Sequence, residues 1–188
     1  MMPFPPAEGE CLIIVDLEAT CWRGKAPAPF EIIEIGAVAW RRGAGVIGEF
    51  QTFVKPQFSS ISEFCTELTT IRQENVDGAP LFPEAWENFR EWMRGYEPFT
   101  LASWGYYDDK QFRKDCERHG IVYDIERHLN LKVAFAQLTG RRKSGLGETL
   151  AIVGLYFEGT HHRGIDDARN IARILEWMVD KTKERTGT

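Results

Sequence analysis

The sequence predicts an α/β fold in which helices cover both faces of a mixed β-sheet. Three observations lead to this prediction. Residues 12–15 are an uninterrupted apolar run, LIIV, which is typical of a strand buried on both faces. Two further strand-like segments follow closely, so an antiparallel meander is expected. The rest of the chain alternates helical segments with a short apolar segment, a pattern that favours parallel strands added to the same sheet.

The three strands of the meander lie in the first third of the chain. A Gly/Ala/Pro loop at residues 23–29 separates the opening strand from residues 31–41, EIIEIGAVAWR, whose alternation between two faces predicts the second strand. A turn at residues 42–45 leads to a third strand over residues 48–54, which Lys55-Pro56 ends. Strands joined by a short Gly-rich turn most simply form an antiparallel hairpin.

Helical patterns dominate the rest of the sequence. Residues 61–75 contain one or two short helical turns, and residues 82–94 predict an amphipathic helix with Pro83 near its start. Residues 98–104, PFTLASW, predict a short buried strand. The later helices are expected over residues 108–119, closed by Gly120, and over residues 130–139, 146–153 and 164–179.

The composition suits a single globular unit. A chain of 188 residues with 43% hydrophobic residues can bury a full core, so we expect one domain over residues 11–180, a flexible arm at 1–10 and a tail at 181–188. No apolar run approaches the ~20 residues of a membrane span, and the amino end lacks the basic start and apolar centre of a signal peptide. We therefore expect a soluble cytoplasmic protein that does not bind membranes.

The net charge and the cysteine spacing exclude further classes of protein. A net charge of −5 argues against a protein that binds long duplex DNA through a broad basic face. It does not exclude a nuclease, because divalent ions bound in an acidic pocket invert the local field. The four cysteines show neither a C-x-x-C pair nor the His spacing of a zinc site, so reduced, packed thiols are expected.

Two acids, Asp16 and Glu18, stand at the end of the opening strand. Side chains two residues apart on a strand point to the same face, so both carboxylates leave the sheet together. Two like charges this close are unfavourable unless a cation lies between them, and hard oxygen ligands suit Mg²⁺ or Mn²⁺. The alternative is that both acids are the solvated end of a strand, which is the commoner meaning of an isolated Asp-x-Glu.

The last predicted helix supplies a third acid. Its apolar residues form one broad stripe, and at about 100° per residue Asp167 falls at the edge of that stripe, whereas Asp166 points away with Asn170 and Arg173. Asp167 therefore faces the sheet and needs a partner, which the first acid pair together with a metal would supply. Alternatively, both helix acids stabilise the helix N-terminus, where Asp is favoured.

Two more segments contribute candidate residues. The loop before the last helix contains His161 and His162, and a histidine with a pKa near 6.5 suits a general base, although an adjacent pair is also common in surface loops. Asp108 and Asp109 stand where the short strand ends and a helix begins, the crevice in which α/β sheets usually hold ligands. Helical phase does not separate these two acids.

At these residues the sequence resembles the DEDDh 3′-to-5′ exonucleases of the DnaQ-like superfamily, which have the RNase H-like fold. It is most similar to the branch that holds the histone-mRNA and enhanced-RNA-interference exonucleases and the bacterial KapD-type proteins. The resemblance extends from residue 12 to about residue 177 and includes VDLEATC, EIIEIGAV, SEFCTELTTIRQENVD, SWGYYDDKQF, NLK and GTHHRGIDDARNIARIL. A single Asp-x-Glu is a weak signal, but this ordered series is specific.

The resemblance implies a site. Asp16 and Glu18 match the first motif, Asp108 matches the acid of the second, and His162 and Asp167 match the third. It implies two divalent ions, Mg²⁺ or Mn²⁺, held by the four acids, with Glu18 also contributing to catalysis and His162 as general base.

A nucleotide pocket is implied as well. The residues that match it are Ala19, Thr20, Phe64, Leu68 and His162. Trp104 and Tyr107 could in addition stack on a base. Ordinary core packing is the alternative for Phe64, Leu68 and both of these aromatic residues.

The expected function is metal-dependent 3′-to-5′ hydrolysis of single-stranded nucleic acid, RNA by resemblance, to nucleoside 5′-monophosphates. The expected partners are the 3′ ends of single-stranded RNA or DNA, a protein partner is possible, and the sequence leaves monomer and homodimer open. Two alternative functions also stay open. One is a DNA proofreading or repair exonuclease, and the other is a non-catalytic regulatory binding protein on the same fold.

Overall fold

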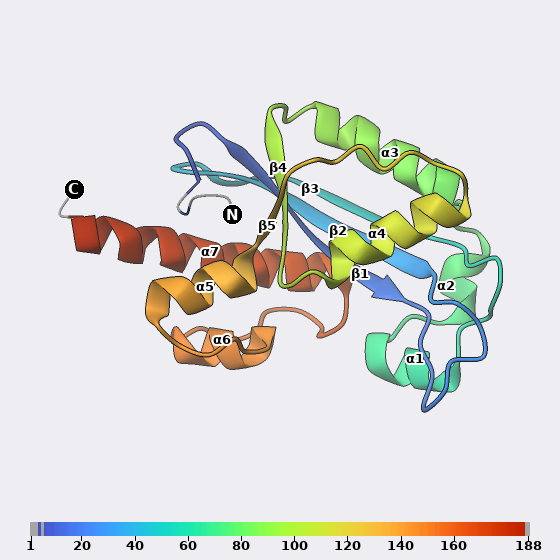
Figure 1. Ribbon diagram of the computed structural model, residues 1–188. Helices are drawn as coiled ribbons and strands as arrows, with labels where there is room; N and C mark the ends of the chain where they lie inside the picture. The colour runs from blue at the N-terminus through green and yellow to red at the C-terminus, as the bar shows by residue number, and fades with distance from the viewer. Residues whose placement is uncertain (1–3, 5, 187–188) are drawn as a thin grey trace.

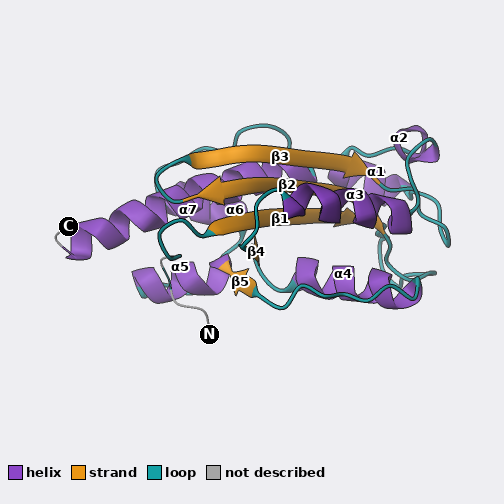
Figure 2. Ribbon diagram, turned by 90° about the horizontal axis from the view of Figure 1, so that it is seen from above, coloured by secondary structure: helices purple, strands orange, loops and turns teal. Residues whose placement is uncertain are grey.

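The computed structural model describes residue 4 and residues 6–186. Its centre is a five-stranded sheet in the order β3-β2-β1-β4-β5, with helices on both sides (Figure 1). The three long strands of the meander lie side by side when the molecule is seen from above (Figure 2). Within the described part of the chain, no helix is long and apolar enough to cross a membrane.

The strand pairing matches the sequence prediction. β1 (Cys11–Ala19) is antiparallel to β2 (Ile32–Arg41), which is antiparallel to β3 (Gly45–Phe53). β4 (Phe99–Ser103) runs parallel to β1, and β5 (His128–Asn130) runs parallel to β4. The predicted mixed sheet, a meander extended by parallel strands, is confirmed.

Helices cover each face of the sheet because alternate residues of β1 point to opposite sides. Ile14 belongs to the core cluster built with α5 (Leu131–Thr139), α6 (Leu146–Ile152) and α7 (Gly164–Thr186). Ile13 belongs to the cluster on the other face, built with α3 (Phe82–Arg94) and α4 (Tyr107–Arg118). The sequence run at residues 12–15 is fully buried, and transfer of each such side chain from water stabilises the fold by roughly 1.5–3 kcal/mol.

Two short helices lie beside the end of the meander. α1 (Glu63–Thr69) and α2 (Gln73–Asp77) form a small separate cluster with Ile33 of β2. Ser62 caps the first turn of α1, since its side chain accepts a hydrogen bond from Cys65 N at 3.0 Å. The predicted helical turns over residues 61–75 thus become two separate helices.

The start of α7 lies directly on the sheet because two glycines permit it. A Cβ atom on Gly36 of β2 would lie 2.0 Å from Gly164 C, and a Cβ atom on Gly164 would lie 2.7 Å from the Asp16 carbonyl oxygen. Asp16 and Gly36 are neighbours in the β1–β2 register. The first turn of α7 is therefore held against the strand that carries the first acid pair.

The observed boundaries differ from the prediction in two places. β5 is a three-residue strand at a position where the sequence predicted only the start of a helix, because its pairing with β4 depends on a distant segment. α7 continues to Thr186 instead of ending at residue 179, so the predicted tail is helical over residues 181–186. A contact with a distant segment holds this extension, since Arg185 Nη1 donates to Leu138 O of α5 at 2.6 Å.

The segment predicted as a flexible arm is partly described. Pro6 is buried. The Glu10 carboxylate accepts a hydrogen bond from Thr100 Oγ1 at 2.7 Å and pairs with Arg127 at 2.7 Å. Residues 1–3 and 5 of the arm and residues 187–188 of the tail lie outside the described residues.

Candidate active site

Three carboxylates from two elements converge at the end of β1. Among the described residues, Asp16, Glu18 and Asp167 are the one group of potential metal ligands whose ligand atoms all lie within 4.8 Å of one another. Glu18 and Asp167 are buried and Asp16 is half-buried. The first two share a face because strand side chains repeat every second residue, and the close approach of α7 adds the third.

Burial disfavours the ionisation of all three carboxylates, and neighbouring acids add to this effect at Asp16 and Glu18. Burial, then Asp167 and Glu34, raise the pKa of Glu18 to about 8. Burial raises the pKa of Asp167 to about 6, against hydrogen bonds from the backbone of Arg163 and His162. The pKa of Asp16 is raised by burial and by the neighbouring acids. A divalent cation would neutralise this repulsion, and three hard oxygen donors are the ligand type that Mg²⁺ and Mn²⁺ prefer.

A fourth acid, Asp108, lies beside this group. Its Oδ1 accepts a hydrogen bond from the backbone N of Leu17, the residue between the first two acids, at 3.1 Å. Burial raises its pKa to about 6, opposed by the hydrogen bonds from Leu17 and from the Ser103 hydroxyl. Asp108 is buried, with 5% of its surface exposed, and lies against the end of β1.

The structure separates Asp108 from Asp109, which helical phase could not do. The Asp109 carboxylate accepts hydrogen bonds from Arg113 at 2.9 and 3.2 Å and from Tyr123 at 2.8 Å. Burial by itself would raise the pKa of Asp109, but these hydrogen bonds lower it overall. Asp109 is thus a partnered structural acid, and Asp108 is the one directed to the carboxylate group.

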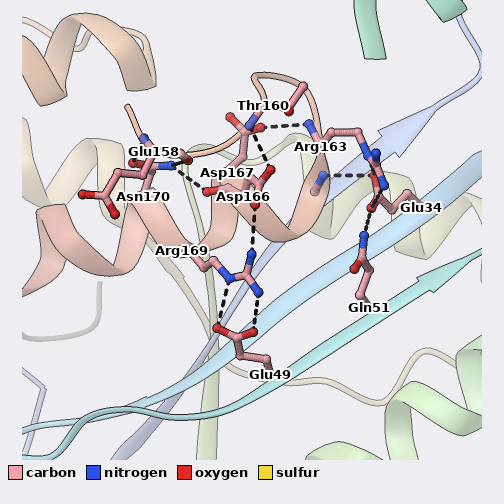
Figure 3. A network of polar contacts seen from close by, with 11 residues as sticks. Glu34, Glu49, Gln51, Glu158, Thr160, Arg163, Asp166, Asp167, Arg169 and Asn170 are labelled. Atoms are coloured by element: carbon pink, nitrogen blue, oxygen red, sulfur yellow. Dashed lines mark hydrogen bonds and ion pairs between the residues drawn. The ribbon is translucent and has the colours of Figure 1, made fainter. Parts of the chain in front are cut away.

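Sequence reasoning missed a fifth acid, Glu34, and its partner Arg163. Glu34 lies directly opposite Glu18 in the β1–β2 register and is fully buried. The Arg163 guanidinium contacts both Glu34 oxygens, at 3.1 and 3.3 Å, and Gln51 Nε2 and Gly164 N donate at 2.6 and 3.1 Å (Figure 3). The signal available in the sequence was a charged residue within the apolar alternation of EIIEIGAV.

Arg163 links this buried acid to the carboxylate group. Its backbone N donates to Asp167 Oδ2 at 3.1 Å, and its guanidinium lies over the Phe53 ring at 5.3 Å. One residue therefore bridges β2, β3 and the first turn of α7. Its charge also lowers the pKa of Glu18, partly offsetting the effect of the other acids.

His162 is exposed in the loop before α7 and does not join the carboxylate group within the described residues. Its backbone is in the left-handed region with φ 58°. Burial, then His161, lower its pKa, so the imidazole is neutral at pH 7. The neighbouring His161 ring stacks on Phe157 with centroids 3.6 Å apart.

The loop that carries His162 is held to α7 by two side chains. Asp166 Oδ2 accepts from Thr160 N at 2.9 Å, and Asn170 bonds the backbone N and O of Glu158 at 3.1 and 2.8 Å (Figure 3). The prediction that Asn170 points away from the protein was wrong, since it is fully buried. The loop covers that side of the helix, which helical phase alone does not reveal.

The residues predicted for the nucleotide pocket differ in their exposure to solvent. Leu68 is 37% exposed and Phe64 is half-buried on the outer side of α1, so neither is ordinary core. The opposite side of α1 is anchored, because Cys65 Sγ contacts Ala19 O at 3.7 Å. Ala19 and Thr20 are buried next to it.

The two aromatic residues of the second motif also differ. Tyr107 is 52% exposed and is available to a ligand. Trp104 is 8% exposed, donates from Nε1 to Ser144 O at 3.1 Å and packs on Phe135. Trp104 therefore fits the alternative of core packing that the sequence left open, because its ring packs in the core with α5.

Comparison with known proteins gives consistent results. The exonuclease family model, RNase_T, matches residues 13–175. The protein called ERI1 exoribonuclease 2 in Danio rerio is 30% identical over 192 residues, which cover 89% of this chain and 35% of that protein. The 3′-5′ exonuclease Snipper of Drosophila melanogaster is 32% identical over 194 residues, which cover 89% of this chain and 69% of that protein.

A solved structure extends the likeness to three dimensions. The nuclease domain of 3′hExo, a DEDDh family member, bound to rAMP, matches with a TM-score of 0.87 at 28% identity and covers 93% of this chain and 94% of that chain. This likeness confirms the predicted RNase H-like nuclease fold. The chain spans about a third of the length of its Danio rerio relative.

Proposed function

Because this chain belongs to the exonuclease family RNase_T, as its resemblance to the DEDDh exonucleases predicted, we propose that it is a metal-dependent 3′-to-5′ exonuclease of single-stranded RNA. Its products would be nucleoside 5′-monophosphates released one at a time from the 3′ end. The observation that carries the proposal is the group formed by Asp16, Glu18 and Asp167, whose ligand atoms lie within 4.8 Å of one another. The chain that holds this group matches the exonuclease family model.

The acids fit the metal that such chemistry needs. Asp16, Glu18, Asp108 and Asp167 would hold two Mg²⁺ or Mn²⁺ ions, since the donors are all hard carboxylate oxygens. Burial raises the pKa of each of these acids, so a bound cation would stabilise their charged forms. When bound, the ions would activate water and stabilise charge on the attacking and leaving oxygens of an in-line displacement.

The side chain that would take the proton from water is His162. Its lowered pKa keeps an imidazole nitrogen free to accept a proton near neutral pH. The loop bonds of Asp166 and Asn170, with the Arg163 bridge to Glu34, hold this residue beside α7. The exposed position of His162 leaves it accessible to a substrate end.

The terminal nucleotide would lie against α1. Phe64 and Leu68 present an apolar surface to its base and sugar, and Tyr107 offers an exposed ring on the opposite rim. The backbone at Ala19 and Thr20, next to the carboxylates, would meet the same nucleotide. Contacts of this kind form no hydrogen bonds with the edges of the bases, so we expect cleavage to depend only slightly on base sequence.

The preference for RNA is supported by the relatives, because the Danio rerio protein is named an exoribonuclease and the 3′hExo domain binds rAMP. The oligomeric state, monomer or homodimer, and any protein partner that delivers the substrate are independent of this proposal. A DNA exonuclease would use the same acids, so only a direct comparison of substrates separates the two activities.

The test uses a 5′-labelled single-stranded RNA and a DNA oligonucleotide of matched sequence with Mg²⁺ or Mn²⁺. A ladder that shortens from the 3′ end, faster on RNA, and that EDTA and Asp16→Ala both abolish, is the expected result. Equal or faster cleavage of the DNA oligonucleotide would indicate that the protein is a DNA exonuclease instead. Cleavage of neither would favour a binding protein on this fold.

A further inference from the structure

A hollow of about 540 Å³ opens along β5 and α5, from Tyr106, just before α4, to Leu138 in the last turn of α5 and Arg185 of α7. Its lining includes the residues Tyr106, His128, Asn130, Val133 and Leu138. The volume is within the range of roughly 300–1,000 Å³ that is typical of ligand sites. Apolar residues of α5 form one wall, and aromatic and polar side chains at the ends of β4 and β5 form the other.

The hollow adjoins the segment that carries Asp108. His128 Nε2, in its lining, lies 2.9 Å from Ser103 Oγ, and the Ser103 hydroxyl donates to Gly105 O at 3.1 Å. Ser103 and Asn130 are neighbours in the β4–β5 register, so the ends of both strands open to the same edge. Tyr106, which lines the hollow, directly precedes α4, and the first turn of α4 carries Asp108, the acid of the second motif.

The side chains at this edge suit single-stranded nucleic acid. Tyr106 is 54% exposed, with its ring centroid 5.8 Å from that of His128, so it presents a face on which a base can stack. Lys132, in the first turn of α5, is half-buried and close enough to lower the pKa of Asp108. Among the described residues no hydrogen bond or ion pair occupies its ammonium, which leaves it available to a phosphate.

A second hollow, of about 600 Å³, shows that size alone is no argument. It lies between the end of α3 and the start of β4, at the other end of the sheet. Its cations are already paired, Arg90 with Asp124 at 2.7 Å and Arg127 with Glu10 at 2.7 Å. The hollow beside α5 differs because an exposed ring, Tyr106, lines it next to the first turn of α4, which carries Asp108. Lys132, the neighbour of its lining residue Val133, has no such partner among the described residues.

The position of α1 gives the direction of the strand. Figures 1 and 2 place the N-terminal end of α4, where Asp108 lies, between α1 and α5. If the terminal nucleotide lies against α1 and the last phosphodiester at the carboxylates, the preceding nucleotides leave toward α5. We propose that this hollow is the upstream subsite of the nuclease, in which Tyr106 stacks on a base before the scissile phosphodiester, and that Lys132, beside the hollow, contacts a phosphate of single-stranded RNA. The proposal rests on the proposed function.

The test compares two substrates that differ only on the upstream side. A uridine pentanucleotide fills the subsite, whereas the p-nitrophenyl ester of uridine 5′-monophosphate has no upstream nucleotide. For Tyr106→Ala we expect the ratio of kcat/KM on RNA to kcat/KM on the ester to fall about 5- to 30-fold, mainly through KM, since stacking on one base is worth that much. Lys132→Gln is expected to lower the same ratio about 3- to 10-fold and to weaken its dependence on salt.

Two controls keep the outcomes distinct. Tyr156→Ala removes a tyrosine that is 87% exposed elsewhere, and the ratio is expected to equal that of the wild type. Binding of a 5′-fluorescent pentanucleotide, followed by anisotropy with Ca²⁺ in place of Mg²⁺, is expected to weaken by the same factors as KM. A ratio in Tyr106→Ala and Lys132→Gln equal to that of the wild type would overturn the subsite even with a fully active nuclease. Failure of the wild type to hydrolyse either substrate would instead overturn the proposed function, and the subsite with it.

Discussion

Two sets of buried carboxylates in this fold differ in what surrounds them. Glu31, Glu34 and Asp115 are buried and satisfied by the protein itself. Glu31 accepts hydrogen bonds from two backbone N–H groups and a serine hydroxyl, and Glu34 from an arginine, a glutamine and a backbone N–H. Asp115 accepts from a glutamine, an arginine and the backbone of Ile32.

The second set, Asp16, Glu18 and Asp167, has few such partners. Asp167 accepts a backbone hydrogen bond from Arg163, whereas in the described residues no hydrogen bond reaches the Asp16 or Glu18 carboxylate. The first set shows that burial alone does not mark a functional acid in this protein. The distinguishing property is buried negative charge that the fold leaves without donors, which is the property of a cation site.

The largest expected effect is on turnover when one acid of the second set is neutralised. Asp16→Asn should lower kcat/KM by roughly 10³-fold or more, because the charge stabilisation that the bound ions supply is worth several kcal/mol. The Tm of the metal-free variant should equal or exceed that of the wild type, since one repulsive charge is gone. Exonuclease assays and thermal unfolding in EDTA measure both. A metal-free variant that is clearly less stable would place Asp16 with the structural acids.

The next effect concerns the histidine outside both sets. His162→Ala should reduce kcat by about 10²- to 10⁴-fold, the range of general acid–base contributions, with Mn²⁺ affinity close to that of the wild type. Single-turnover kinetics and calorimetric Mn²⁺ titration provide the readouts. His161→Ala is the matched control, because its ring stacks on Phe157. Near-wild-type turnover in His162→Ala would show that another group takes the proton.

Removal of a residue that pairs with the first set should lower the stability of the protein, whereas neutralising Asp16 of the second set should not. Arg163→Met leaves Glu34 charged, buried and without its guanidinium, and should lower the free energy of unfolding by about 3 kcal/mol. Arg142→Met is the control, because its pair with Glu148 is exposed and worth roughly 1 kcal/mol or less. Urea unfolding of both metal-free variants gives the difference. Equal losses would mean that burial does not strengthen the dependence of Glu34 on its partner.

The smallest expected effect is a dependence of stability on pH. The pKa of Glu18 is raised from 4.5 to about 8, so its protonated form is favoured in the folded protein. This contribution to stability is full below pH about 4.5 and is lost as pH rises through about 8, so the Tm of the metal-free protein should fall across that window. Glu18→Gln, and Mg²⁺ added to the wild type, should each flatten the curve. A flat curve for the metal-free wild type would contradict the repulsion within the second set.

Part of this site could be read from local patterns. Strand alternation places Asp16 and Glu18 on one face whatever the rest of the chain does, and helical phase placed Asp167 on the inner side of α7. The resemblance of the motif SWGYYDDKQF chose Asp108 over its neighbour, and the structure explains that choice by the hydrogen bonds that occupy Asp109. Local periodicity is sufficient for Asp16, Glu18 and Asp167 because each of these inferences concerns a single element, whereas Asp108 needed the family motif.

The sequence by itself determined the meander, the positions of most helices and the three acids of the second set, because these depend on the period of side chains along one segment. Only the tertiary structure decided that Glu34 lies opposite Glu18 with Arg163 as its partner, that Trp104 and Asn170 are buried, and that a hollow opens beside α5. Each of these results depends on contacts between segments far apart in the chain. Burial and pairing are properties of the assembled layers, which no local pattern contains.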